Sequence, residues 1–216
     1  MTDSFMLATR IPMTREDFEL WLDTPAPGRD AIANPEAMFD GWFWDGRVAD
    51  SEWESADVGR TPREFFAERV QEACAGTSTA CVVVYSEGAL EAYLFDVGYV
   101  TERVHTALLL FAAAVGLESA AEESRVLFWA ETSGSLREAD WRGWLSVLSV
   151  GKEGARFPGV VDLSGAVDGL RAVEERFFAM VERLAEDEES WDWDSALLFH
   201  TDTPRDQSFV DPGVLA

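Results

Sequence analysis

The amino-acid sequence predicts an α+β protein with a mixed sheet of four or five strands, a central hairpin, and helices packed against that sheet. Two observations predict this class: amphipathic helical runs follow β-rich runs along the chain, and a hairpin interrupts their order. The hairpin argues against a purely parallel, doubly wound sheet. With 216 residues, 47% of them hydrophobic, the chain is expected to form a single globular domain over residues 1–216.

The N-terminal segment is predicted to form a strand followed by a short helix. Residues 5–13 have the apolar content of a strand, and Thr14, with acidic residues directly after it, supplies a helix cap. Three large apolar side chains then fall at helical spacing: Phe18, Trp21 and Leu22. This spacing gives the helix one apolar face for packing.

Residues 24–60 show no helical or strand periodicity. The segment is rich in proline and glycine, and it also carries several aromatic and acidic residues. Long segments without regular structure inside a compact domain are usually functional. We therefore expect a long aromatic and acidic loop insertion here.

The centre of the chain is predicted to form a helix and a hairpin. Thr61 begins a capping box with Pro62 at the first helical position and Glu64 three residues after the cap, so a helix should run to about residue 75. Residues 79–85 are rich in β-branched side chains, and a turn at 86–88 leads to a second apolar run, 90–95.

The C-terminal half is expected to contain further helices and strands. They are a largely buried helix over 98–116, a strand over 125–130, a helix over 135–148 opened by a second capping box, a short strand over 160–161, a long amphipathic helix over 164–188, a last strand over 196–199 and a tail over 201–216.

The charge is strongly acidic. Forty-one acidic residues oppose seventeen basic ones, for a formal net charge of -24, and Lys152 is the only lysine. Such a surface repels nucleic acid and anionic lipid and attracts cationic partners. A genome-wide codon bias would also deplete lysine, but the acidity is concentrated toward both ends of the chain, which a uniform bias does not explain.

No familiar catalytic signature is present in the sequence. There is no nucleophile elbow, no phosphate-binding glycine loop and no His-Glu-x-x-His motif. Two cysteines give neither a disulfide framework nor a zinc set, so no cofactor or bound metal is expected. His105 lies within an apolar helical run and is expected to be structural. Only His200 has carboxylates near it in sequence that suit a divalent metal, at Asp192, Asp194 and Asp202.

Tryptophan alternates with acidic residues in three places. In extended backbone this alternation puts the aromatic side chains on one face and the carboxylates on the other. Either the tryptophans cover the edge of the core, or they are anchors of an interaction surface whose carboxylates orient a basic partner. The candidate partner-binding residues are Asp40, Trp42, Trp44, Asp45, Glu52, Trp53, Trp191, Asp192, Trp193 and Asp194.

Three classes of function remain open. The favoured hypothesis is an acidic, cytoplasmic inhibitory protein that docks on a basic protein, such as an immunity protein that neutralises a cognate toxin, without binding nucleic acid or membranes directly. The second is a metal- or carboxylate-dependent enzyme with a site near Asp192, Asp194, His200 and Asp202. The third is an acidic scaffold or oligomerising module with no catalytic role. The N-terminus carries no recognisable secretory signal.

Overall fold

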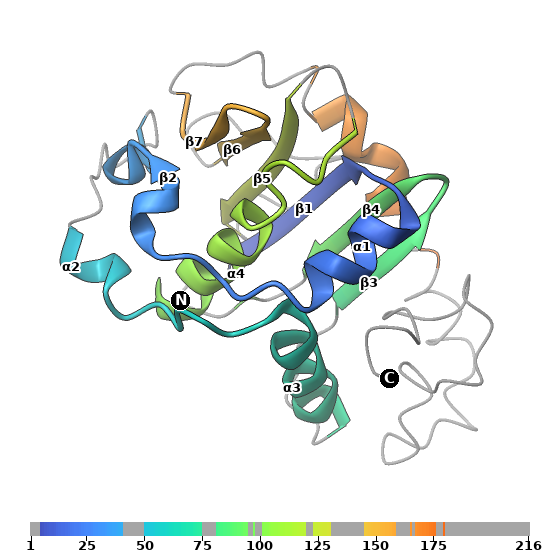
Figure 1. Cartoon of the computed structure of the whole chain (residues 1–216), viewed down its shortest axis with the longest axis horizontal. Coiled ribbons are helices and arrows are strands. Elements are labelled where there is room, and N and C mark those ends of the chain that lie inside the picture. Colours follow the sequence, from blue (N-terminus) through green and yellow to red (C-terminus); the bar gives the residue numbers. More distant parts are fainter. Residues whose placement is uncertain are drawn as a thin grey trace.

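The computed structural model is a seven-stranded sheet with helices on both faces (Figure 1). It describes residues 5–40, 50–74, 81–94, 97, 101–119, 123–130, 145–158, 165, 167–175 and 179. The strands are β1 (Phe5–Pro12), β2 (Ile32–Ala33), β3 (Cys81–Ser86), β4 (Ala89–Leu94), β5 (Ser124–Ala130), β6 (Leu145–Gly151) and β7 (Gly154–Arg156). The helices are α1 (Arg15–Leu22), α2 (Asp50–Trp53), α3 (Pro62–Cys74) and α4 (Thr101–Ala112), with short 3-10 helices η1 (Arg29–Ala31) and η2 (Pro35–Ala37). Residues 167–175 are also helical.

The sheet is mixed, as predicted, but larger than predicted. Its order is β2-β7-β6-β5-β1-β4-β3, with β2 parallel to β7 and every other pair antiparallel. The predicted number of four or five strands is therefore wrong. Strands β2 and β7 have two and three residues, which is too short to produce a periodic signal in the sequence.

Strand β6 begins in the last four residues of the segment over 135–148 that the sequence assigned to a helix, whereas residues 135–144 lie outside the described residues. The predicted helix over 135–148 ends in Leu145–Leu148, and these residues pair with β5 as part of β6. All seven residues of β6 are buried, because the strand lies between β5 and β7 in the sheet. A strand buried on both faces does not need to alternate apolar and polar residues. The tryptophans and leucines over 135–148 therefore matched the spacing of a helix, and β6 gave no strand pattern of its own.

The predicted hairpin is formed by β3 and β4. Its two turn residues, Glu87 and Gly88, have φ values of 49° and 75°, the left-handed pair that a tight two-residue hairpin turn requires. The hairpin is not central, however. Strand β3 forms one edge of the sheet, because β4 pairs with β1 on its other side.

Two predicted helix starts are confirmed by their caps. The Thr14 hydroxyl accepts a hydrogen bond from the Asp17 backbone N–H at 3.1 Å. At α3 the capping box is complete: Thr61 Oγ1 accepts from the Glu64 N–H at 3.2 Å, and Glu64 Oε2 accepts from the Thr61 N–H at 3.0 Å.

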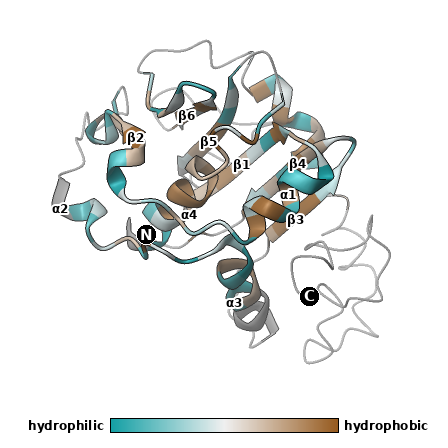
Figure 2. Cartoon of the chain, in the orientation of Figure 1, coloured by the Kyte–Doolittle hydropathy of each residue, from teal (hydrophilic) through white to brown (hydrophobic). Residues whose placement is uncertain are grey.

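Helices α1, α3 and α4 meet in an aromatic core on one face of the sheet. The Trp21 ring of α1 stacks on Phe111 of α4 and lies 6.2 Å from the ring of Phe66 on α3. The indole N–H of Trp21 donates to the backbone oxygen of Leu110 at 2.8 Å, so this fully buried side chain keeps its hydrogen bond. Figure 2 colours α4 and the central strands as the most hydrophobic part of the molecule.

The helix at 167–175 lies on the opposite face of the sheet. Tyr85 packs against Phe18 of α1, and its cross-strand partner is Leu90. Tyr93, three residues beyond Leu90 in β4, points to the other face and contacts Glu174 of this helix.

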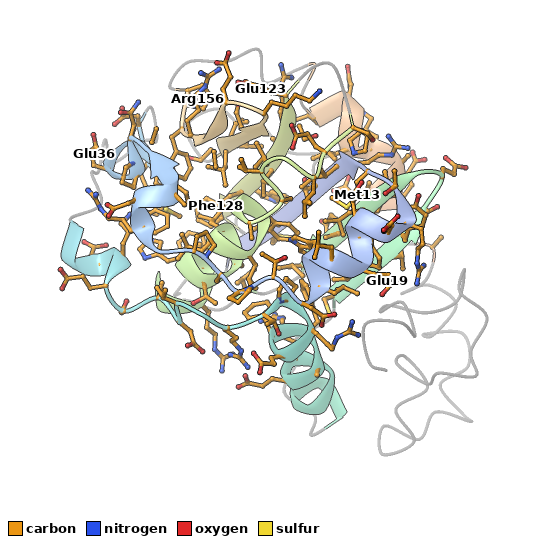
Figure 3. All side chains as sticks on the ribbon, viewed as in Figure 1. Met13, Glu19, Glu36, Glu123, Phe128 and Arg156 are labelled. Carbon is orange, nitrogen blue, oxygen red and sulfur yellow. The ribbon has the colours of Figure 1, made fainter. Side chains whose placement is uncertain are left out.

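An ion pair connects β7 to the residue that precedes β5. Arg156 of β7 pairs with Glu123, which directly precedes β5 (Figure 3).

Several sequence expectations fall outside the described residues. The strands predicted at 160–161 and 196–199 and the tail at 201–216 are among them. The described part of the 24–60 segment contains η1, β2, η2 and α2, so regular structure occurs within the expected loop.

Candidate functional site

Three of the ten predicted partner-binding residues lie within the described structure. Asp40 and Glu52 are exposed, whereas Trp53 is buried. The other seven lie outside the described residues: Trp42, Trp44, Asp45, Trp191, Asp192, Trp193 and Asp194. Their partner-binding role stays a prediction.

Trp53 is a core residue and not the exposed anchor that the sequence led us to expect. Its side chain is 1% exposed, its ring stacks on His105 of α4 and it lies 6.4 Å from the ring of Phe157. The alternation argument assumed extended backbone, in which residues two apart share a face. Residues 50–53 are helical instead, so successive side chains point about 100° apart and Trp53 turns inward.

The carboxylates on either side of Trp53 point outward. Glu52, Glu54 and Asp57 are all exposed, and we call residues 52–57 the acidic segment. Figure 2 shows α2 and the chain that follows it as mainly hydrophilic, beside the hydrophobic α4. The segment therefore presents charge to solvent on one side and an aromatic anchor to the core on the other.

Two hydrogen bonds between backbone atoms of the acidic segment and side chains of α4 fix the segment on this helix. The Glu52 carbonyl oxygen lies 3.0 Å from Nδ1 of His105, and the Asp57 N–H donates to Oγ1 of Thr106 at 2.9 Å. His105 and Thr106 are consecutive residues of α4, and both are buried. The segment is thus attached at both of its ends, with the Trp53 ring between them.

The charges of the acidic segment are only partly neutralised. Arg60 pairs with Asp57 at 3.6 Å and also with Glu68 of α3, so one cation serves two carboxylates. Within the described part of the chain, Glu52 and Glu54 form no ion pair. The segment therefore keeps a local negative field.

One exposed apolar side chain adjoins these carboxylates. Val58 directly follows Asp57 and is 54% exposed. Gly59, with φ of 91°, forms the turn after it, and its N–H donates to the carbonyl oxygen of Ala26 at 2.9 Å. Because its neighbours are fixed in this way, Val58 stands at a defined position beside the acidic segment.

His105 is buried and neutral at physiological pH. Desolvation lowers the pKa of its imidazole, and this effect exceeds the opposing influence of Glu52, whose backbone oxygen and charge favour the protonated form. The expected structural, hydrogen-bonded histidine is confirmed by its burial and by its contact with Glu52.

A second polar cluster lies on the other face of the sheet. The Tyr93 hydroxyl donates to Glu174 Oε1 at 3.5 Å, and Arg10 pairs with Glu91 at 3.3 Å. Burial, with the neighbouring Glu174 charge, raises the pKa of Tyr93 far above its ordinary value. Sequence reasoning missed this cluster; its only signal was a glutamate inside the apolar strand 89–94.

Neither cysteine chemistry nor a metal site is evident in the described residues. Burial raises the pKa of Cys81 to about 11, so its thiol stays protonated and unreactive at neutral pH. No group of three or more histidine, cysteine, aspartate or glutamate side chains within the described ranges is placed to hold a metal ion. The candidate metal ligands Asp192, Asp194, His200 and Asp202 lie outside those ranges.

None of the described helices is both long and apolar enough to cross a membrane. In the comparisons with known proteins, no family model, curated protein or solved structure matches the chain.

Proposed function

We propose that this protein binds a basic protein partner through the acidic segment, and that it acts as an inhibitory protein of the immunity type, which neutralises a cognate toxin. The observation that carries the proposal is the pair of exposed carboxylates of Glu52 and Glu54, which have no ion-pair partner in the described structure and sit on a backbone fixed to α4. The overall charge of -24 supports it as well.

Carboxylates on an ordered backbone suit recognition better than carboxylates on a flexible loop. A partner that binds a flexible acidic loop must first order it, and that ordering weakens the complex. The stacking of Trp53 and the two hydrogen bonds to α4 order the backbone beforehand. Complementary charge then accelerates association and selects against partners of the wrong sign.

Val58 gives the proposed surface an apolar element. Interfaces concentrate their binding energy in a few desolvated contacts and surround them with polar groups. An exposed valine directly after Asp57 matches this arrangement on a small scale. We therefore expect the partner to offer arginine or lysine side chains around an apolar contact.

The assignment to an immunity protein can be tested by co-expression. The protein encoded by the adjacent gene is expressed alone and together with this chain, and growth of the host is followed. The proposal expects growth arrest by the neighbour alone and recovery when the wild-type chain is present.

Two sets of charge-neutralising variants test whether the toxin binds at the acidic segment. Replacing Glu52, Glu54 and Asp57 with their amides removes three charges from the acidic segment, whereas Glu16→Gln, Glu87→Gln and Glu153→Gln together remove three exposed charges from other parts of the chain. Recovery should fail with the first set and persist with the second. A neighbour that does not arrest growth, or an arrest that the wild-type chain does not relieve, contradicts the proposal.

A further inference from the structure

The contact between the acidic segment and α4 depends on one ionisable side chain, His105. This imidazole is fully buried, and its ring centroid lies 4.0 Å from that of Trp53, with 14° between the two planes. Its Nδ1 lies 3.0 Å from the Glu52 carbonyl oxygen. The same side chain therefore makes both the stacking contact and one of the two hydrogen bonds that fix the segment.

The hydrogen bond defines the proton on the ring. A carbonyl oxygen only accepts, so Nδ1 carries the proton and donates it. In the neutral imidazole, Nε2 is then without a proton, and Nε2 has no hydrogen-bond partner among the described residues. Adding a proton would bury a full charge and a donor with no acceptor there, which is a costly state.

Few charges stand near enough to offset that cost. The elements that pack against α4 carry few ionisable residues near His105. They are Asp50 and Glu52 on α2, Glu54 directly after α2, and the Arg29–Asp30 ion pair on η1, whereas β6 has none. Helix α4 itself carries Glu102 and the exposed Arg103, and α1, which packs on Phe111 at the other end of α4, carries Arg15, Glu16, Asp17 and Glu19. Glu52 attracts the protonated ring, but its carboxylate faces solvent. Burial therefore determines which form the folded site prefers.

We infer that His105 is a pH-sensitive positioning residue, whose neutral form holds the acidic segment on α4 and whose protonated form releases it. Release hydrates the imidazolium, and it requires the stack on Trp53 and the bond to Glu52 to open together. The effect on partner binding rests on the proposed function, whereas the release itself does not.

The sign of the pH dependence follows from proton linkage. Above about pH 6.5, the ordinary pKa of histidine, the imidazole is neutral in both the attached and the released segment, so pH has no effect. Below that value the released form binds a proton that the attached form does not. The released population then rises up to about tenfold for each pH unit, until the lower pKa of the attached form is reached.

Hydrogen exchange tests the inference without any partner. Backbone amides of residues 52–57 are followed between pH 7.5 and pH 5 after correction for the intrinsic chemistry of exchange, with the amides of β5 as an internal reference. Wild-type protein should lose protection at 52–57 as the pH falls, while β5 keeps its own. His105→Phe retains an aromatic ring against Trp53 but does not titrate, so its protection should not depend on pH.

A second measurement covers the case in which His105→Phe does not fold. The chain has two histidines, so His200→Gln leaves a single imidazole whose NMR titration belongs to His105. The inference expects a pKa below 6.5, with new exchange at 52–57 over the same pH range. An ordinary pKa, or equal pH dependence in wild type and His105→Phe, would overturn it. Because no partner is present, this result stands apart from the co-expression assay.

Discussion

The Trp53 indole stacks on the His105 imidazole with 4.0 Å between the ring centroids. This contact joins the acidic segment to α4, whose residues from Val104 to Ala112 are all buried. Charge on the outside and aromatic packing on the inside are thus properties of the same six residues, 52–57.

Removing the Trp53 side chain should destabilise the protein. Trp53→Ala deletes a buried indole and leaves a cavity beside His105 and Phe157, so we expect a loss of about 3–5 kcal/mol in the free energy of unfolding, measured with urea. Trp53→Phe keeps a ring and should lose much less stability. A Trp53→Ala protein as stable as wild type would show that the stack contributes nothing.

Truncating Trp42, Trp44, Trp191 or Trp193 to alanine should instead weaken partner binding by at least about 2 kcal/mol, with little change in melting temperature.

The Tyr93 hydroxyl should stabilise the docking of the 167–175 helix. Tyr93→Phe removes the donor to Glu174 and leaves that buried carboxylate with one hydrogen bond fewer, which should cost about 1–3 kcal/mol of unfolding free energy. Tyr85→Phe is the control, because Tyr85 is only partly buried and donates to a backbone oxygen of Met13. Equal losses in the two variants would argue against a special role for the Tyr93 contact.

The ion pair between Asp23 and Arg63 should contribute a small, pH-dependent stability. Hydrogen bonds from Arg63, at 2.8 and 3.3 Å, hold the pKa of Asp23 below its ordinary value of 3.8. The contribution is therefore present above about pH 3.8 and disappears as the pH falls through the lower, folded pKa. Asp23 is exposed, so Asp23→Asn should cost less than about 1 kcal/mol at pH 7, and this cost should shrink as the pH falls below 3.8. A cost that grows as the pH falls would contradict this sign.

The protein should not bind DNA or RNA directly. With a net charge of -24 it offers no excess of cations to release the counterions of a phosphate backbone. A gel-shift assay with labelled duplex and single strands should show unchanged migration at low salt. Slower migration of the labelled nucleic acid with the purified protein alone would contradict this prediction.

Local signals in the sequence were enough to locate much of the fold. The capping threonine Thr14, the capping box at Thr61, the β-branched residues before Glu87 and the apolar run of α4 each act within a few residues, and each was confirmed. Strand β6 was missed because its neighbours β5 and β7, not its own pattern, make it a strand. The edge position of β3 was missed for a related reason, since pairing order depends on contacts between distant segments.

The candidate site could be predicted only in part. The alternation of acid and tryptophan located Glu52 on the surface, but it failed for Trp53 because the backbone there is helical. Nothing in the sequence indicated that His105, about fifty residues away, would receive that side chain. Long-range contacts of this kind appear only once the elements are packed.

The most direct test of the account is the rate at which the protein associates with its basic partner, measured by stopped flow as a function of salt. Exposed charges are screened over about 8 Å at physiological ionic strength, so steering by the acidic segment should make the wild-type rate fall steeply as salt is raised. The variant neutralised at Glu52, Glu54 and Asp57 should associate more slowly at low salt and show a shallower dependence than the variant neutralised at Glu16, Glu87 and Glu153. Equal rates and equal slopes for the two variants would contradict the account, because only net charge, and no particular surface, would then guide the encounter.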